Sequence, residues 1–153
     1  MHKKKIKKFL PFLIIFFIVF ILVFYYFSEK VKIINEDILN ISLEFLLSDY
    51  FKNVTISFFE NDNLASIAKN SFKISYTLGI IKNLKNLNFS IQGRLFNESS
   101  GFIILIREKN CAENYIKAIN ASFIEICGKS EKELEHVTEK FLKILIEKSN
   151  IQT

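Results

Sequence analysis

The strongest constraint on this chain is an uncharged run of 19 residues, 9–27, with the sequence FLPFLIIFFIVFILVFYYF. At 1.5 Å per residue a helix of that length spans roughly 28 Å, close to the ~30 Å thickness of the hydrocarbon core of a bilayer. A helix that covers the core of a globular domain would carry a polar face, and this run has none. The run therefore predicts a single transmembrane helix at residues 9–27.

The end of the run favours a retained anchor over a cleaved signal peptide. A signal peptidase requires small residues after an apolar stretch of ~7–15 residues, whereas Tyr25, Tyr26 and Phe27 are bulky. Tyrosine rings also suit the membrane–water interface. The first cysteine is Cys111, which excludes a lipoprotein cleavage site near the run. We therefore expect an uncleaved signal-anchor, with a cleaved signal peptide as the alternative.

The positive charge is concentrated before the run. Five of the 21 basic residues lie in the first eight positions, and the 16 that remain equal the 16 acidic residues. The folded part is therefore neutral, which does not favour nucleic-acid binding. The positive-inside rule predicts a cytoplasmic tail (1–8), the membrane helix (9–27), a linker (28–34) and an extracytoplasmic domain (35–150) of a single-pass membrane protein in the cell envelope.

Hydrophobic periodicity predicts an α+β domain, with a mainly antiparallel sheet of about five strands and three to four helices. Asn35 is the expected N-cap of a helix that extends to Tyr50, because Glu36 and Asp37 follow in its first turn. Ser130 and Glu133 form a capping box before a helix that extends to residue 148. Alternation of apolar and polar residues predicts strands at 54–58, 72–80, 87–95, 102–107 and 122–127, and a further helix is expected at 111–119.

Two cysteines, Cys111 and Cys127, lie 16 positions apart in the domain. An isolated pair in an oxidising compartment favours a disulfide, and two buried free thiols are the alternative. A catalytic pair of a cysteine with His136 is disfavoured, because Glu133, Glu135 and Glu139 surround that histidine as on a solvated helix face. We expect no metal site and no cofactor, because the domain holds a single histidine and lacks metal-ligand spacing.

The tripeptide Gly128-Lys129-Ser130 resembles the end of a phosphate-binding loop. That loop requires a second glycine five positions earlier, where this chain has Phe123. Capping of the following helix by Ser130 accounts for the same residues, so we expect no nucleotide site.

Five Asn-X-Ser/Thr sequons exceed the roughly 1.6 expected by chance from this composition and make glycosylation of an exposed surface a hypothesis. Polar strand faces that alternate also place Asn and Ser two positions apart, which is the alternative explanation. Asn97, in a predicted hairpin loop, is the first candidate, and the others are Asn53, Asn88, Asn40 and Asn120.

The sequence favours a non-catalytic binding or assembly module, whose partner is another envelope protein or a second copy of itself. Phe59, Ile81 and Phe96 interrupt the alternation of their strands, and either form an exposed apolar patch or cover the sheet beneath a helix. The alternative function is an outward-facing hydrolase with carboxylates near strand ends. The acids that would serve it are Glu60, Asp62, Glu98 and Glu108.

Overall fold

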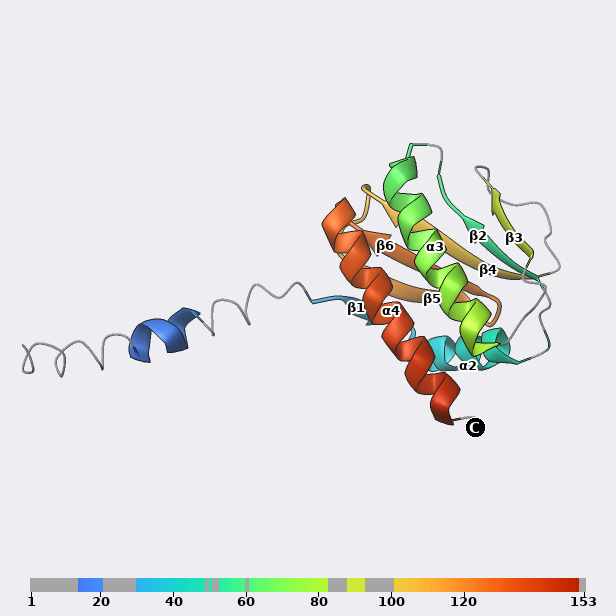
Figure 1. The fold of residues 1–153 in the computed structure, drawn as a ribbon, viewed down its shortest axis with the longest axis horizontal. Helices are drawn as coiled ribbons and strands as arrows, with labels where there is room; N and C mark the ends of the chain where they lie inside the picture. Colours follow the sequence, from blue (N-terminus) through green and yellow to red (C-terminus); the bar gives the residue numbers. More distant parts are fainter. Residues whose placement is uncertain are drawn as a thin grey trace, which may run out of the picture. The chain divides into compact units, whose positions relative to one another are not determined.

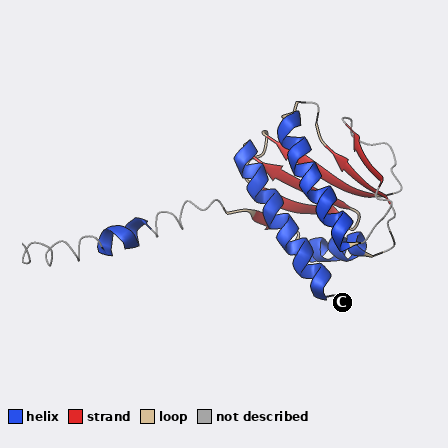
Figure 2. Ribbon diagram, viewed as in Figure 1, coloured by secondary structure: helices blue, strands red, loops and turns tan. Residues whose placement is uncertain are grey.

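The computed structural model describes residues 14–20, 30–48, 50, 53–59, 61–82, 88–92 and 101–151. The chain forms two compact units, residues 1–30 and 31–153. The second unit is an α+β domain (Figures 1 and 2). Its elements in chain order are β1 (Lys32–Ile34), α2 (Glu36–Leu47), β2 (Asn53–Ser57), α3 (Leu64–Ile81), β3 (Asn88–Gln92), β4 (Phe102–Glu108), β5 (Tyr115–Asn120), β6 (Phe123–Gly128) and α4 (Glu131–Ile151).

The described strands form one mixed sheet in the order β1-β5-β6-β4-β2-β3. Four neighbouring pairs are parallel, and β5 with β6 is the antiparallel pair. The prediction of a mainly antiparallel sheet is therefore wrong. Apolar and polar residues alternate along the strands of a sheet with one covered face, whether the strands are parallel or antiparallel. The direction of a strand depends on the connections and not on the residue pattern. Here α3 connects β2 to the strands that follow, so the chain re-enters the sheet in the same direction.

One face of the sheet and the helices enclose a single hydrophobic core. Side chains alternate between the two faces of a strand, so Ile104 and Ile106 of β4 point into the core while Leu105 and Arg107 point to the opposite face. Helices α3 and α4 lie side by side over the core face (Figure 1), and α2 lies against β5 and α4. The face that carries Arg107 is not covered by these three helices.

The helices at the two ends of the domain follow their predicted starts. In α4 the predicted stripe is completely buried, and its members are Leu134, Val137, Phe141 and Leu145. The Glu133 amide donates to the Ser130 hydroxyl at 3.4 Å. In α2, the side chain of Asn35 does not cap the helix. Its amide instead donates to the Ala118 carbonyl of β5 at 3.0 Å, so this residue ties the start of α2 to the sheet.

Two predicted elements have the wrong secondary structure. Residues 72–80, predicted as a strand, belong to the helix α3, whose N-cap Asn63 accepts a hydrogen bond from the Ala65 amide at 3.2 Å. Residues 111–119, predicted as a helix, contain most of β5, which pairs with β1 on one side and β6 on the other. Backbone pairing with two neighbours overrides the weak helix propensity of this segment.

The prediction of a transmembrane helix at residues 9–27 is also corrected. Of this stretch the structure describes residues 14–20, which are helical. Among the described residues no helix combines the length and the apolar character needed to cross a membrane. The predicted tail (1–8) and the remainder of the run lie outside the described residues. A single-pass membrane protein with an extracytoplasmic domain is therefore not supported.

Candidate functional site

The face of the sheet opposite the three helices carries a polar cluster around Arg107. The Arg107 guanidinium donates to Glu125 Oε1 at 3.0 Å and lies 4.6 Å from the centre of the Phe59 ring. Burial, together with the nearby Glu125 carboxylate, raises the pKa of Tyr115 to about 12. Arg107 and Glu125 thus form an ion pair that joins β4 to β6, while Arg107 Nε finds no hydrogen-bond partner in the described part of the chain.

Two carboxylates meet at the ends of β2 and β4. Asp62 accepts the backbone amides of Phe59 and Glu108, each at 3.1 Å. Burial raises the pKa of Asp62 above its usual range, although the two amides oppose that shift. Glu108 is 2% exposed, and its Oε2 finds no hydrogen-bond partner in the described part of the chain. The structure thus brings together two of the acids proposed for a hydrolase, while Glu60 and Glu98 lie outside the described residues.

The arrangement of the Asp62–Glu108 pair suits the fixing of a loop against a strand and not a catalytic dyad. Both oxygens of Asp62 are occupied by backbone amides, which is the usual arrangement for fixing a loop against a strand. Among the described residues no group of three or more Asp, Glu, His or Cys side chains could hold a metal ion. Neither of the two grooves described below is lined by these carboxylates.

The two cysteines form a disulfide between the segment before β5 and the end of β6. Their Cα atoms lie 6.1 Å apart. Cys127 is buried on β6, whereas Cys111 is half-buried. With both sulfurs joined, a nucleophilic pair with His136 has no thiol, and that histidine is exposed on α4.

The segment resembling a phosphate loop has a packing role. A Cβ placed on Gly128 would lie 2.3 Å from the backbone nitrogen of Leu134, so only glycine lets the first turn of α4 approach β6. The Lys129 amide donates to Asn114 Oδ1 at 3.0 Å, and Ser130 caps the helix. The backbone amides of Lys129 and Glu133 are thus engaged within the domain.

The candidate glycosylation sites are scattered over the domain. Asn40 on α2, Asn53 at the start of β2 and Asn120 at the end of β5 are exposed. The Asn120 side chain accepts the Ser122 amide at 2.9 Å, so it also holds the β5–β6 turn. Asn88 begins β3, and Asn97 lies outside the described residues. Use of these sequons stays a prediction.

The apolar residues singled out in the sequence do not form one patch. Phe59 is half-buried under Arg107, and Ile81 is half-buried against the core. Phe96 lies outside the described residues. An exposed apolar surface on the helix α3 was missed, because the sequence predicted a strand there.

Helix α3 presents this apolar surface on its outer side. Phe72, Tyr76 and Ile80 are 70%, 62% and 62% exposed, and the rings of Phe72 and Tyr76 stack with centres 6.1 Å apart. Leu64 and Ala68 continue the same i, i+4 row toward the helix N-terminus and are also exposed. We call these five residues the α3 apolar row. The signal that identifies the row in the sequence is this i+4 spacing, which the period-two alternation of the same segment conceals.

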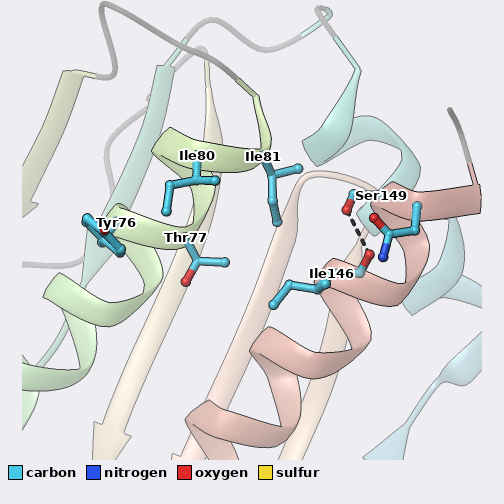
Figure 3. Close-up of a pocket in the computed structure, with 7 residues that line it drawn as sticks. Tyr76, Thr77, Ile80, Ile81, Ile146 and Ser149 are labelled. Carbon is cyan, nitrogen blue, oxygen red and sulfur yellow. Dashed lines mark hydrogen bonds between the residues drawn. The ribbon is translucent and has the colours of Figure 1, made fainter.

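A groove adjoins the C-terminal end of the row, between α3 and α4. Figure 3 shows Thr77 and Ile81 on the α4 side of α3, with Ile146 of α4 pointing toward them. The groove has a volume of about 420 Å³, room for a few side chains. Its lining residues are Tyr76, Thr77, Ile80, Ile81, Ile146, Ser149 and Asn150.

The charged residues of α3 do not interrupt the row. Lys69 contacts Glu135 of α4 at 3.0 Å, and Lys73 contacts Glu135 and Glu139 at 2.7 and 3.1 Å. Hydrogen bonding to Glu135 raises the pKa of Lys73 and lowers the pKa of Glu135, so both partners stay charged near neutral pH. The cations are thus drawn to the α4 side.

A second groove runs along α4 and is polar. It is lined by charged residues of both signs together with His136, Ile33 and Ile144. The Lys140 ammonium donates to the Val31 carbonyl at 2.9 Å, and the Lys143–Glu147 pair is 4.0 Å apart. These groups are solvated or paired within the domain, and the groove shows no concentration of one charge.

Comparison of the chain with protein-family models, with curated proteins and with solved structures finds no match.

Proposed function

We propose that the domain is a non-catalytic binding or assembly module, and that its contact surface is the α3 apolar row with the adjoining groove. The observation that carries this proposal is the exposure of Phe72, Tyr76 and Ile80 on one helix face. Large apolar side chains exposed in a contiguous row are a liability for a folded domain unless a partner covers them. Aromatic side chains are also the residues that dominate binding energy at protein interfaces.

The chemistry of the row favours an apolar helix of a protein partner. Ala65 and Ala68 are small and exposed beside the aromatic rings, which lets a second helix approach closely. The groove beyond Ile80 accepts apolar side chains from the same helix. The hydrolase alternative has less support, because Asp62 is engaged by backbone amides and Glu108 is buried.

Photo-cross-linking in cells that produce the full chain tests this function. A benzoylphenylalanine at position 72 or 76 should yield a discrete covalent adduct, because these side chains touch the partner. The same probe at Lys132, exposed on the first turn of α4, is the matched control and should yield none. With the probe at 72, adding Ile80→Glu should abolish the adduct, while adding Lys132→Glu should not. Absence of any adduct from 72 and 76 would overturn the proposal.

A further inference from the structure

The exposed face of α3 can pair with an identical copy of itself. Its exposed residues are those of the α3 apolar row, Leu64, Ala68, Phe72, Tyr76 and Ile80, each four positions from the next. On a helix of 3.6 residues per turn an i, i+4 row is inclined to the helix axis, and two such rows pack against each other when the helices cross at about 50°. The row is centred on Phe72, close to the midpoint of Leu64–Ile81. An identical row laid antiparallel therefore meets it position by position, with apolar side chains at both ends and a small residue opposite a large one between the centre and each end.

From this symmetry we infer that the partner of the α3 face is a second copy of this chain, in a two-fold dimer with antiparallel α3 helices centred on Phe72. This inference rests on the proposed function and names its partner. A two-fold interface is self-complementary, so each residue of one copy meets its counterpart reflected through the centre. The register follows directly: Phe72 meets Phe72, Ala68 meets Tyr76, and Leu64 meets Ile80.

The sizes of the paired side chains are complementary in this register. Ala68 is small and Tyr76 is large, so the tyrosine ring of one copy fills the space above the alanine of the other. Phe72 lies on the two-fold axis, where two aromatic rings can pack in an offset or edge-to-face arrangement. Leu64 of the second copy lies beside Ile80, next to the groove between α3 and α4, and offers an apolar side chain to it.

The charges are also compatible with this pairing. Lys69 falls opposite Ser75 in the antiparallel register, so the two copies bring no like charges of α3 together. Lys69 and Lys73 are already neutralised by Glu135 and Glu139 within each copy. A polar or charged partner would leave the aromatic rings unmatched, whereas the same uncharged face on a second copy matches them.

The area available is sufficient for a reversible dimer. The exposed parts of Leu64, Phe72, Tyr76 and Ile80 offer on the order of 500 Å² per copy, given the size of such side chains. A standard protein interface buries ~800 Å² per partner. Ala68 and the groove residues Ile146 and Asn150 lie at the same surface and add to this area. We therefore expect dissociation constants in the micromolar range, typical of small interfaces.

Mass measurement of the purified full chain tests the dimer. Light scattering and sedimentation should give a concentration-dependent mass that rises from 17.9 kDa toward twice that value. Phe72→Glu opposes two carboxylates at the axis and should weaken association roughly 100-fold or more. Lys132→Glu is the control and should leave association unchanged, with circular dichroism verifying that both variants are folded. Association that is absent, or that survives Phe72→Glu, overturns the inference.

Cysteine cross-linking tests the register. Mixing chains with Ala68→Cys and chains with Tyr76→Cys should give a disulfide-linked heterodimer under mild oxidation. Ala68→Cys alone should not cross-link efficiently, since in the antiparallel register its two copies are about 12 Å apart along the axis. Cross-linking of Ala68→Cys to itself in preference to the mixture would overturn the antiparallel arrangement.

The two proposals fail in different ways. If the purified chain remains monomeric while the probe at position 72 forms an adduct of another mass in cells, the dimer is wrong and the binding function stands. If neither association nor any adduct occurs, the α3 face is not a binding surface.

Discussion

Tyr115 lies on the face of the sheet opposite the helices, and its acidity depends on its neighbours. Its ring lies beside the Glu125 carboxylate, which is paired to Arg107. Burial of the phenol and the adjacent negative charge both disfavour the phenolate, which raises the pKa of Tyr115 from 10.0 to about 12. The unfolded chain lacks both effects, so the phenol ionises there at its ordinary value.

This difference links stability to pH in the alkaline range. A group whose pKa is raised by folding contributes stability that is fully present below its unfolded pKa and is lost as pH rises through the folded value. We therefore expect the free energy of unfolding to fall between pH ~10 and ~12 more steeply in the natural chain than in Tyr115→Phe. Urea unfolding at stepped pH values measures this. Identical pH profiles for the two chains would contradict the placement of Tyr115 beside Glu125.

At the scale of elements, α3 shows why one residue pattern can describe two structures. Phe72, Ile74, Tyr76, Leu78 and Ile80 alternate with period two, as a strand does. In a helix the same set separates into two i, i+4 rows on opposite sides. One row is buried against the sheet and the other is exposed. An apolar segment with both rows filled is ambiguous, and burial against β4 together with the Asn63 cap decides for the helix.

The contact between α3 and α4 depends on Glu135, which bridges Lys69 and Lys73. We expect Glu135→Gln to lower the urea midpoint of unfolding, and the difference to shrink in ~1 M salt, where the Debye length is about 3 Å. Because these lysines lower the pKa of Glu135, the stabilisation is present above its ordinary value of 4.5 and is lost as pH falls through the lowered value.

The matched control for this ion pair is Glu147→Gln. Its partner Lys143 lies on the same helix at 4.0 Å, so the pair contributes nothing to helix–helix contact. A loss for Glu135→Gln that equals the control at every salt concentration would show that the α3–α4 ion pairs do not stabilise the packing.

At the scale of the whole molecule, the disulfide joins two segments that are 16 positions apart in the sequence. Cys111 precedes β5, and Cys127 lies on the neighbouring strand β6. The bond closes the loop that contains the antiparallel pair, beside the residues Lys109 and Asn110 with positive φ. It thereby holds β5, and with it β1, at that edge of the sheet.

Reduction of this bond should lower the free energy of unfolding by roughly 3 kcal/mol, the value expected from chain entropy for a loop of this size. Denaturant unfolding with and without a reductant measures the change. Cys111→Ser should show the same loss and no further response to the reductant. An unchanged midpoint on reduction of the natural chain would contradict a stabilising disulfide.

The sequence by itself determined the neutral charge of the domain, the helices α2 and α4, and the central strands β2, β4 and β6. Caps, buried stripes and apolar runs are local signals, and each of these elements satisfies its own pattern. The tertiary structure decided strand direction, the helical state of α3 and the strand β5. These features depend on which neighbouring elements supply backbone hydrogen bonds and cover apolar faces. The order of residues along the chain does not specify those neighbours. The candidate site belongs to the second group: only after Ile74 and Leu78 are buried does the opposite side of α3 become an exposed row.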